Sequence, residues 1–247
     1  MNPANAFTER LLVTAGVAPG MRVLDLGCGT GDVSLLAAKL VGSAGAVVGV
    51  DRDPRAIEEA RRRAPGPNIS FLEARLDSID LPAESFDAIV ARRVLMYLSD
   101  PLAILRQVTT SLRPGGGVAV QEHDATLVPA GSPRLPLHDR VMAWIWTTVE
   151  REGGNLRLGF ALPALFEDAG LQDIHAEAVA VLRTPHDADA LAPIVRAMLP
   201  RLIEHGVATA DEIGVDTLGV RLAEERRAAR ATYLTDLAFG VWARKSL

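Results

Sequence analysis

A glycine-rich loop constrains this chain more than any other feature of its sequence. The loop spans residues 25–31 with the letters DLGCGTG, where the apolar run 23–27 meets the Leu- and Ala-rich stretch 32–41. Glycines at a turn between a strand and a helix let a ligand approach the backbone, and the first N–H groups of the helix have no helical partners. The loop therefore predicts a ligand site at a strand–helix turn, on the carboxyl edge of a parallel sheet.

Further apolar runs repeat the strand-then-helix order along the first half of the chain. Asp53–Pro54 and Asp100–Pro101 each predict a helix start, with Asp as N-cap and Pro in the first turn. Buried strands are predicted at 46–51, 69–73, 86–91 and 118–122, and the helix from Pro101 is predicted to carry an apolar stripe of Leu102, Leu105, Val108 and Leu112 until 114–116 ends it. This alternation predicts an α/β doubly wound fold with a mostly parallel sheet covered on both faces.

The second half of the chain is predicted to be mainly helical. Helices are expected at 137–151, around Leu162 up to Gly170, and over 187–231, broken by Pro200 and Gly206; strands are expected at 173–183 and 233–243. Neither a repeat nor a linker interrupts the chain. We therefore expect one domain over 1–247, with a cofactor-binding core at 20–124 and helical substrate-cap additions at 125–160 and 187–231.

Charge and cysteine content narrow the partners. The net charge is −5, from 31 acidic against 26 Lys and Arg residues, which argues against a nucleic-acid partner. Cys28 is the only cysteine, so no internal disulfide can form, as is usual in a reducing compartment. No signal-like segment or apolar run of bilayer length is present, so we expect a cytoplasmic protein without a membrane partner. A homodimer stays open.

The spacing around the loop indicates which ligand it binds. A dinucleotide fingerprint would place its third glycine one residue later than Gly31, and Asp32 would face a pyrophosphate unfavourably. The sequence also lacks the Gly-Lys-Ser/Thr of a P-loop. Asp51 ends the second predicted strand, where a carboxylate can accept hydrogen bonds from both ribose hydroxyls. These features together predict a nucleoside ligand without a phosphate chain.

At this point the sequence resembles the class I S-adenosylmethionine-dependent methyltransferases. Residues 23–31 are similar to the first motif of that family, and Asp51 stands in the place of its ribose-binding acid. Further similar segments are Asp77–Ser78 ahead of 81–82, the fourth-strand segment 86–90, the segment 112–116 before the fifth strand, and the final strand 239–245. The resemblance implies a seven-stranded, mostly parallel Rossmann-like sheet whose last strand is antiparallel. It also implies methyl transfer from S-adenosylmethionine to a small molecule, leaving S-adenosylhomocysteine.

The resemblance also implies roles for residues of the loop and of the strand ends. Gly27 and Gly29 would lie against the methionine and ribose parts of the cofactor, and Asp25 would fix the loop or meet the amino group through water. The whole implied cofactor-binding set is Asp25, Gly27, Gly29, Gly31, Asp51, Arg52, Asp77, Ser78, Ala91 and Arg92.

The other implied roles have alternatives that the residues themselves leave open. Arg52 would cover an adenine face, and Asp77 would accept from the adenine amino group with the Ser78 N–H beside it; Asp77 could equally be a helix cap. Ala91 and Arg92 would border the methionine moiety. Arg92–Arg93 could instead pair with a substrate carboxylate, because the arginine fork matches that group.

The sequence carries no fixed catalytic motif for methyl transfer. A sulfonium methyl is already electrophilic, so catalysis can rest on proximity, which supplies on the order of 7–11 kcal/mol. His123 is a candidate general base because imidazole titrates near neutrality, and Tyr97 is a second candidate. Glu122, His123 and Asp124 are too generic a group to predict a metal, and none is predicted.

Three other functions remain as rivals. One is an S-adenosylmethionine-binding protein that transfers no methyl group, because fold and cofactor site alone do not fix an activity. Another is an NAD(P)-dependent reductase on a similar sheet. The position of Gly31 and the acid at Asp32 argue against it. The last is a methyltransferase of macromolecules; segment 91–95 lacks the nucleic-acid-type catalytic motif. The preferred hypothesis is O-, N- or C-methylation of a small molecule, with secondary metabolism as a plausible setting.

Overall fold

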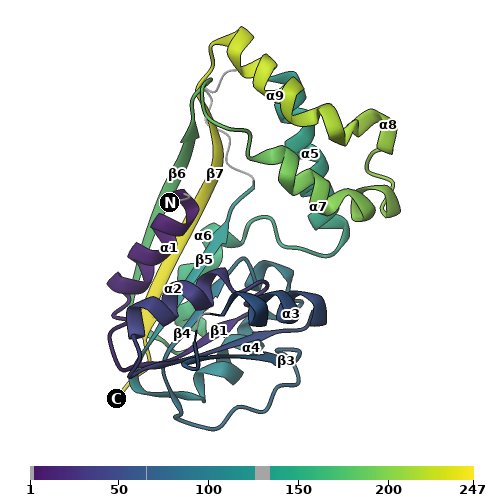
Figure 1. Cartoon of the computed structure of the whole chain (residues 1–247). Coiled ribbons are helices and arrows are strands. Elements are labelled where there is room, and N and C mark those ends of the chain that lie inside the picture. Colours follow the sequence, from purple (N-terminus) through teal and green to yellow (C-terminus); the bar gives the residue numbers. More distant parts are fainter. Residues whose placement is uncertain (1–2, 65, 126–133) are drawn as a thin grey trace. The chain divides into compact units, whose positions relative to one another are not determined.

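The computed structural model describes residues 3–64, 66–125 and 134–247, shown in Figure 1. These residues belong to two compact units: Met1–His123 with Leu158–Val179 and Ala238–Leu247, and Asp124–Arg157 with Ala180–Leu237. The strands are β1 (Arg22–Leu26), β2 (Ala46–Asp51), β3 (Ile69–Glu73), β4 (Phe86–Arg92), β5 (Leu112–His123), β6 (Gln172–Arg183) and β7 (Tyr233–Arg244). The helices are α1 (Pro3–Thr14), α2 (Asp32–Val41), α3 (Pro54–Arg63), η1 (Leu95–Tyr97), α4 (Pro101–Thr109), α5 (Pro136–Arg151), α6 (Leu158–Asp168), α7 (Leu191–Glu204), α8 (Ala210–Ile213) and α9 (Val215–Ala229).

The strands form one mostly parallel sheet. Among the described residues it has seven strands in the order β3-β2-β1-β4-β5-β7-β6. The pairs from β3 through β5 are parallel, and β7 lies antiparallel to β5. The predicted doubly wound sheet with an antiparallel last strand is confirmed. The strand order reverses between β1 and β4, and the carboxyl ends of strands open a crevice at such a switch point.

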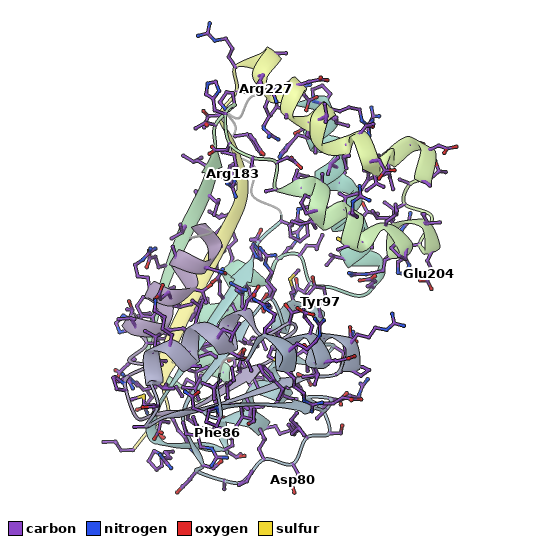
Figure 2. The ribbon with its side chains drawn as sticks, viewed as in Figure 1. Asp80, Phe86, Tyr97, Arg183, Glu204 and Arg227 are labelled. Atoms are coloured by element: carbon purple, nitrogen blue, oxygen red, sulfur yellow. The ribbon has the colours of Figure 1, made fainter. Side chains whose placement is uncertain are left out.

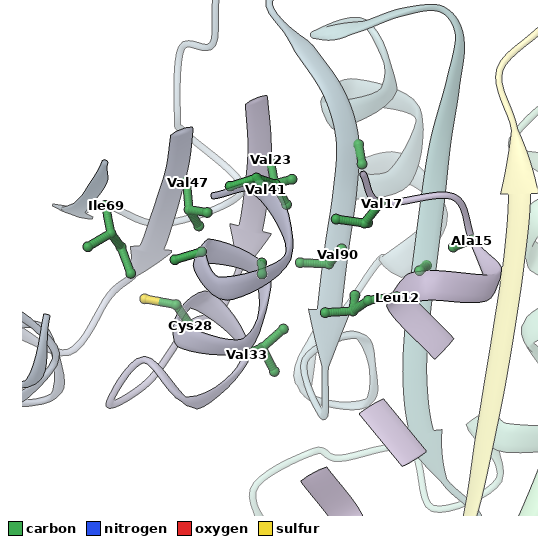
Figure 3. Close-up of a cluster of buried hydrophobic side chains, with 14 of the residues drawn as sticks. Leu12, Ala15, Val17, Val23, Cys28, Val33, Val41, Val47, Ile69 and Val90 are labelled. Atoms are coloured by element: carbon green, nitrogen blue, oxygen red, sulfur yellow. The ribbon is translucent and has the colours of Figure 1, made fainter. Parts of the chain in front are cut away.

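Helices cover both faces of the sheet. On one face α1, α2 and α3 pack on strands β1 to β5, and Figure 3 shows part of the buried cluster that joins them, including Leu12, Val33 and Val90. Side chains on successive strand residues point to opposite faces. Leu24 and Ile89 are fully buried outside that cluster, so the second face is covered too. There α6 packs on β5 and α4 packs on α6.

Two helix predictions needed correction. Leu112 is not on the stripe of α4, because the helix ends at Thr109 and Leu112 begins β5 in register with Phe86. Pro200 does not break a helix: it lies inside α7, whose buried stripe includes Met198 and Leu202. A proline in a helix interior removes one hydrogen bond, and burial of an apolar stripe can outweigh that loss. The predicted N-caps of α3 and α4 are confirmed: Asp53 accepts from Arg55 N–H and Asp100 from Ala103 N–H.

The second unit is built around three helices that contact one another, α5, α7 and α9. Their shared core includes Val141, Val195 and Leu222, each without solvent exposure. Arg226 on α9 is also buried, and its guanidinium pairs with Asp189 at 3.0 Å. Helices α5, α7, α8 and α9 lie within the ranges 125–160 and 187–231, whereas α6, which starts at Leu158, belongs to the first unit; residues 126–133 lie outside the described part. That the whole chain is one domain stays a prediction.

Across the described residues, none of the helices combines the length and apolar character that a membrane crossing requires.

Candidate functional site

A pocket lies within the first unit at the carboxyl edge of the sheet. Its lining comes from the segments that follow four parallel strands: β1, β2, β3 and β4. The lining residues are Gly27, Asp51, Arg52, Ala74, Arg75, Leu76, Asp77, Arg93, Val94, Tyr97 and Leu98. The predicted site residues Gly27, Asp51, Arg52, Asp77 and Tyr97 are therefore brought together from distant parts of the sequence.

Gly27 of the glycine loop lines one side of this pocket, Gly29 is not among the lining residues, and the loop has a backbone that disfavours side chains. Gly27 and Gly29 have φ angles of 58° and 52°, in the left-handed region. A Cβ on Gly27 would lie 2.5 Å from Cγ2 of Val94, so the loop touches the segment after β4 directly. A Cβ on Gly29 would meet nothing within 4 Å, so space remains open beside that residue.

Asp51 connects the loop to the end of β2. Its Oδ2 accepts a hydrogen bond from Gly29 N–H at 2.8 Å, and its Oδ1 accepts from Asp53 N–H at 2.9 Å. Asp51 is half-buried and lines the pocket. An ionised carboxylate has about four acceptor directions, so two remain for a ligand. The residue therefore holds the loop and can accept hydrogen bonds from hydroxyl groups.

Asp25 lies beneath the loop, outside the pocket lining. It is 1% exposed, and its Oδ2 accepts a hydrogen bond from Ser34 Oγ at 2.5 Å, which ties β1 to α2. Burial raises the pKa of Asp25 to about 7, against the lowering effects of Ser34 and Arg92. Oδ1 of Asp25 is buried without a hydrogen-bond partner. The contacts support the predicted role of fixing the loop.

The segment after β3 brings a pair of opposite charges to the pocket. The Arg75 guanidinium binds the Asp77 carboxylate through two hydrogen bonds, Nε to Oδ1 at 3.0 Å and Nη2 to Oδ2 at 2.5 Å. This pairing lowers the pKa of Asp77. Ser78 donates its backbone N–H to the carbonyl of Arg75 at 3.3 Å and is not part of the lining. An adenine amino group placed here would share the Asp77 carboxylate with the Arg75 guanidinium.

The other side of the pocket is the wall formed by residues 93–98. Arg93 leaves β4 with a φ of 58°, which is unusual for a residue with a side chain. Its backbone N–H donates to Gln121 O at 2.9 Å, and its Nε donates to His123 Nε2. The helix η1 follows, and Tyr97, labelled in Figure 2, is 43% exposed at its end.

Glu122 on β5 holds the start of this wall. Its Oε1 accepts from Val94 N–H at 2.8 Å and from Leu95 N–H at 2.7 Å. The residue is fully buried, and burial raises its pKa to about 7. The sequence placed Glu122 only in a generic polar group with His123 and Asp124 after the fifth strand. The long-range pairing of β4 with β5 puts it beside residue 94, and nothing local in the sequence signals that.

Several predicted site residues lie outside the lining. Arg92 donates to Asn5 Oδ1 at 2.9 Å and Thr8 Oγ1 at 3.1 Å, which ties β4 to α1. Ala91 is buried within β4. Gly31 is the left-handed N-cap of α2. Cofactor contacts for all three stay predictions.

His123 is also outside the lining, 2% exposed near the end of β5. Of the two catalytic candidates, only Tyr97 is therefore at the pocket. Within the part of the chain that the structure describes, no group of three or more His, Cys, Asp or Glu residues is placed to hold a metal ion.

Comparison with known proteins assigns the chain to a family. A family model described as a methyltransferase domain matches residues 18–157. The chain is 34% identical over 145 residues to trans-aconitate 2-methyltransferase of Rhizobium leguminosarum, covering 59% of this chain and 54% of the relative. It is 37% identical over 114 residues to aklanonic acid methyltransferase of a Streptomyces species, covering 45% and 52%. The chain thus spans about half the length of these curated relatives.

A solved structure has the same fold. The S-adenosylmethionine-dependent methyltransferase from Aquifex aeolicus superposes with a TM-score of 0.58 at 19% identity, covering 96% of this chain and 88% of the other. Because the family model covers more than half of the chain, and the glycine loop, Asp51 and the switch-point pocket are in place, the protein belongs to the class I S-adenosylmethionine-dependent methyltransferases.

Proposed function

We propose that this chain binds S-adenosylmethionine in the pocket of the first unit and transfers its methyl group to a small molecule. The observation that carries the proposal is Asp51: it lines the pocket, holds the glycine loop through Gly29 N–H, and keeps acceptor directions for two hydroxyl groups. The family to which the chain belongs supports the same cofactor.

The residues at the pocket fit the chemistry of this cofactor. Asp51 suits the ribose diol. Asp77, although paired with Arg75, offers an acceptor for the adenine amino group, and the open space beside Gly29 admits a ligand against the backbone. The exposed Arg52 is available to cover one adenine face, and the Gly27 side of the pocket is left for the methionine part.

Bound in this way, S-adenosylmethionine supplies a methyl group on a positively charged sulfur, which is already a strong electrophile. The protein then has to bring the acceptor atom into line behind the methyl group and to exclude water. Tyr97 is the candidate that could orient an acceptor, because its side chain is at the pocket. A general base is needed only where the acceptor must lose a proton early. His123, turned to Arg93, is the weaker candidate.

Relatives support a small acceptor. The names of two of them specify methyltransferases of trans-aconitate and of aklanonic acid, both small organic acids. For this chain the acceptor, the atom methylated and a role in secondary metabolism are proposals. The use of the second unit as a cover for the acceptor, the cytoplasmic location, a homodimer and the absence of nucleic-acid and membrane partners also remain predictions.

The reductase alternative gains no support. Asp32 begins α2, the helix that would have to face a pyrophosphate, and its carboxylate is within 2.7 Å of Arg63 and 3.4 Å of Arg92. A carboxylate at that helix start competes with a phosphate group for the helix dipole. A protein that binds S-adenosylmethionine without methyl transfer is separated from the proposal only by an assay of the reaction.

The test is a calorimetric titration of the protein with S-adenosylmethionine, S-adenosylhomocysteine and NADH. Binding of the first two at micromolar concentrations, with no heat from NADH, is the expected result. Formation of S-adenosylhomocysteine is then followed by mass spectrometry with a panel of small carboxylic acids. Binding of NADH alone would refute the proposed cofactor, and binding of S-adenosylmethionine without turnover on any acceptor would favour the non-methylating alternative.

A further inference from the structure

The helix η1 in the 93–98 wall has no N-cap side chain of its own. A helix begins with backbone N–H groups that have no partner within the helix, and a polar side chain at the N-cap usually accepts from them. Val94 stands at the N-cap of η1 and makes no side-chain hydrogen bond there. The N–H groups of Val94 and Leu95 are buried, so leaving them without acceptors would be costly.

The acceptor for these N–H groups is Glu122 of strand β5, 28 residues after Val94. Oε1 of Glu122 lies 2.8 Å from Val94 N and 2.7 Å from Leu95 N, and all three residues are buried. Hydrogen bonds to a carboxyl group in a water-free interior are strong and well oriented. The carboxyl group of Glu122 therefore replaces the missing N-cap of η1.

The position of residues 94 and 95 also sets the width of the pocket. Val94 approaches the loop so closely that a Cβ on Gly27 would collide with its side chain. Arg93, Val94, Tyr97 and Leu98 all belong to the pocket lining, whereas Glu122 does not. A shift of residues 94 and 95 would therefore move the 93–98 wall relative to Gly27.

We propose that Glu122 is a positioning residue for the cofactor: its buried side chain holds the backbone of residues 94 and 95, and so fixes the 93–98 wall against the glycine loop. This inference rests on the proposed binding of S-adenosylmethionine in the pocket. Nothing in it requires Glu122 to touch the ligand.

The experiment compares Glu122→Gln, Glu122→Ala and Glu122→Asp with the wild-type protein. Gln keeps a carbonyl oxygen that can accept from both N–H groups, Ala removes the acceptor, and Asp withdraws it by one methylene. A matched control is Gln121→Leu, which changes a neighbouring buried residue of β5 whose side chain accepts from Thr8 Oγ1 at 2.7 Å, on the opposite face of the strand from Glu122.

Hydrogen exchange without cofactor provides the first measurement, because it tests the hold on the wall independently of the proposed function. We expect faster exchange in the 93–98 segment for the Ala and Asp variants, and wild-type exchange there for the Gln variant and the Gln121→Leu control. Unchanged exchange in Glu122→Ala would overturn the inference. If Glu122→Ala does not fold, Glu122→Asp gives the same comparison.

Calorimetry with S-adenosylhomocysteine is the second measurement. We expect affinity to fall about tenfold or more for Glu122→Ala, because the wall is no longer held against Gly27, and to stay within about threefold of wild type for Glu122→Gln. Equal loss in Gln121→Leu would indicate a general destabilisation and would refute the positioning role. Failure of the wild-type protein to bind would refute the proposed function instead, while the exchange result would still stand.

Discussion

Asp51 and Glu122 hold opposite sides of the same pocket, and they do so in different surroundings. Each carboxyl group accepts hydrogen bonds from two backbone N–H groups: Asp51 from Gly29 and Asp53, Glu122 from Val94 and Leu95. Asp51 is half-buried and belongs to the lining; Glu122 is fully buried and does not. A carboxylate at the pocket can serve the loop and a ligand together, whereas a buried one can serve only the fold.

The buried surroundings of Glu122 also change its titration. Burial raises the pKa of Glu122 to about 7, and the backbone N–H groups that it binds oppose that rise only in part. Oε2 of Glu122 has no hydrogen-bond partner, so the ionised form is poorly compensated. The contribution of Glu122 to stability therefore depends on pH.

The largest expected effect comes from Asp51→Ala. This change removes both the acceptor for the ribose hydroxyls and the hydrogen bond that holds Gly29, and hydrogen bonds to a charged group contribute about 1.5–3 kcal/mol each. We expect the affinity for S-adenosylhomocysteine to fall by about 100-fold or more, measured by calorimetry. Asp53→Ala, which removes only the N-cap of α3, serves as control and should leave the affinity within a few-fold. Similar losses in both variants would contradict the special role of Asp51.

Gly27→Ala should follow, because it brings the two sides of the pocket into collision. The new Cβ would lie 2.5 Å from Val94, at a left-handed φ, so we expect about 1–3 kcal/mol of destabilisation from overpacking and backbone strain. Gly29→Ala introduces the same backbone strain without a collision, so it should lower the free energy of unfolding by less, about 1 kcal/mol. Urea unfolding of both variants measures the difference.

A Val94→Ala background sharpens this comparison. If the collision is the cause, Gly27→Ala should destabilise that background much less than it destabilises the wild-type protein. Additive effects in the double variant would mean that the loop and the wall do not contact each other.

An intermediate effect is expected in the pH dependence of stability. The folded pKa of Glu122 is raised from its ordinary value of 4.5 to about 7, so the folded state retains a proton that the unfolded state has released between those values. The contribution of Glu122 is therefore complete below pH 4.5 and is lost as the pH rises through 7. Arg93 is the charged side chain that opposes the shift.

The measurement is urea unfolding at several pH values from 5 to 8. Glu122→Gln cannot titrate, so the free energy of unfolding should fall less steeply with pH, by about 1–3 kcal/mol across the window. Asp25→Asn should flatten the curve similarly, because burial raises the pKa of Asp25 to about 7 as well. Gln121→Leu should retain the wild-type slope. Parallel curves for wild type and Glu122→Gln would show that Glu122 does not titrate in this range.

The smallest effect is expected at the rim, where Arg75 pairs with Asp77. Both side chains are exposed, and ion pairs in solvent are weakened by screening and by side-chain entropy. Arg75→Ala should leave the Tm unchanged, and it should not weaken binding of S-adenosylhomocysteine because it releases Asp77 for the adenine group. Asp77→Ala should weaken binding a few-fold. A large loss in Arg75→Ala would assign the ligand contact to Arg75 instead.

Much of the first unit was predictable because its signals are local. The glycine loop, the N-caps Asp53 and Asp100, and Asp51 at the end of its strand each depend on a few neighbouring residues. The boundaries of α2, β2 and β3 coincide with the predicted ones. The errors arose where tertiary packing overrides local preference, as at Leu112, which pairs in the sheet, and at Pro200, which remains in a helix.

Five predicted residues line the pocket, but the residues that hold the 93–98 wall in place were not predicted. The loop and Asp51 follow from the motif. Arg92 lies outside the lining and donates hydrogen bonds to Asn5 and Thr8 of α1, and its contact with the cofactor stays a prediction. The pocket residue on that side is its neighbour Arg93, whose positive φ redirects the chain after β4. A reversal of this kind has no sequence signature when the residue is not glycine.

By itself, the sequence determined the order of strands and helices, the strand–helix turn with its glycines, and the acid that meets that turn from the next strand. These depend on periodicity, capping and φ preference, which act over a few residues. Only the tertiary structure decided that Glu122 caps the wall at 94 and 95, that Val94 closes on Gly27, and that His123 faces Arg93 and not the pocket. Those contacts depend on which strands become neighbours and in what register, and that is set by burial over the whole sheet.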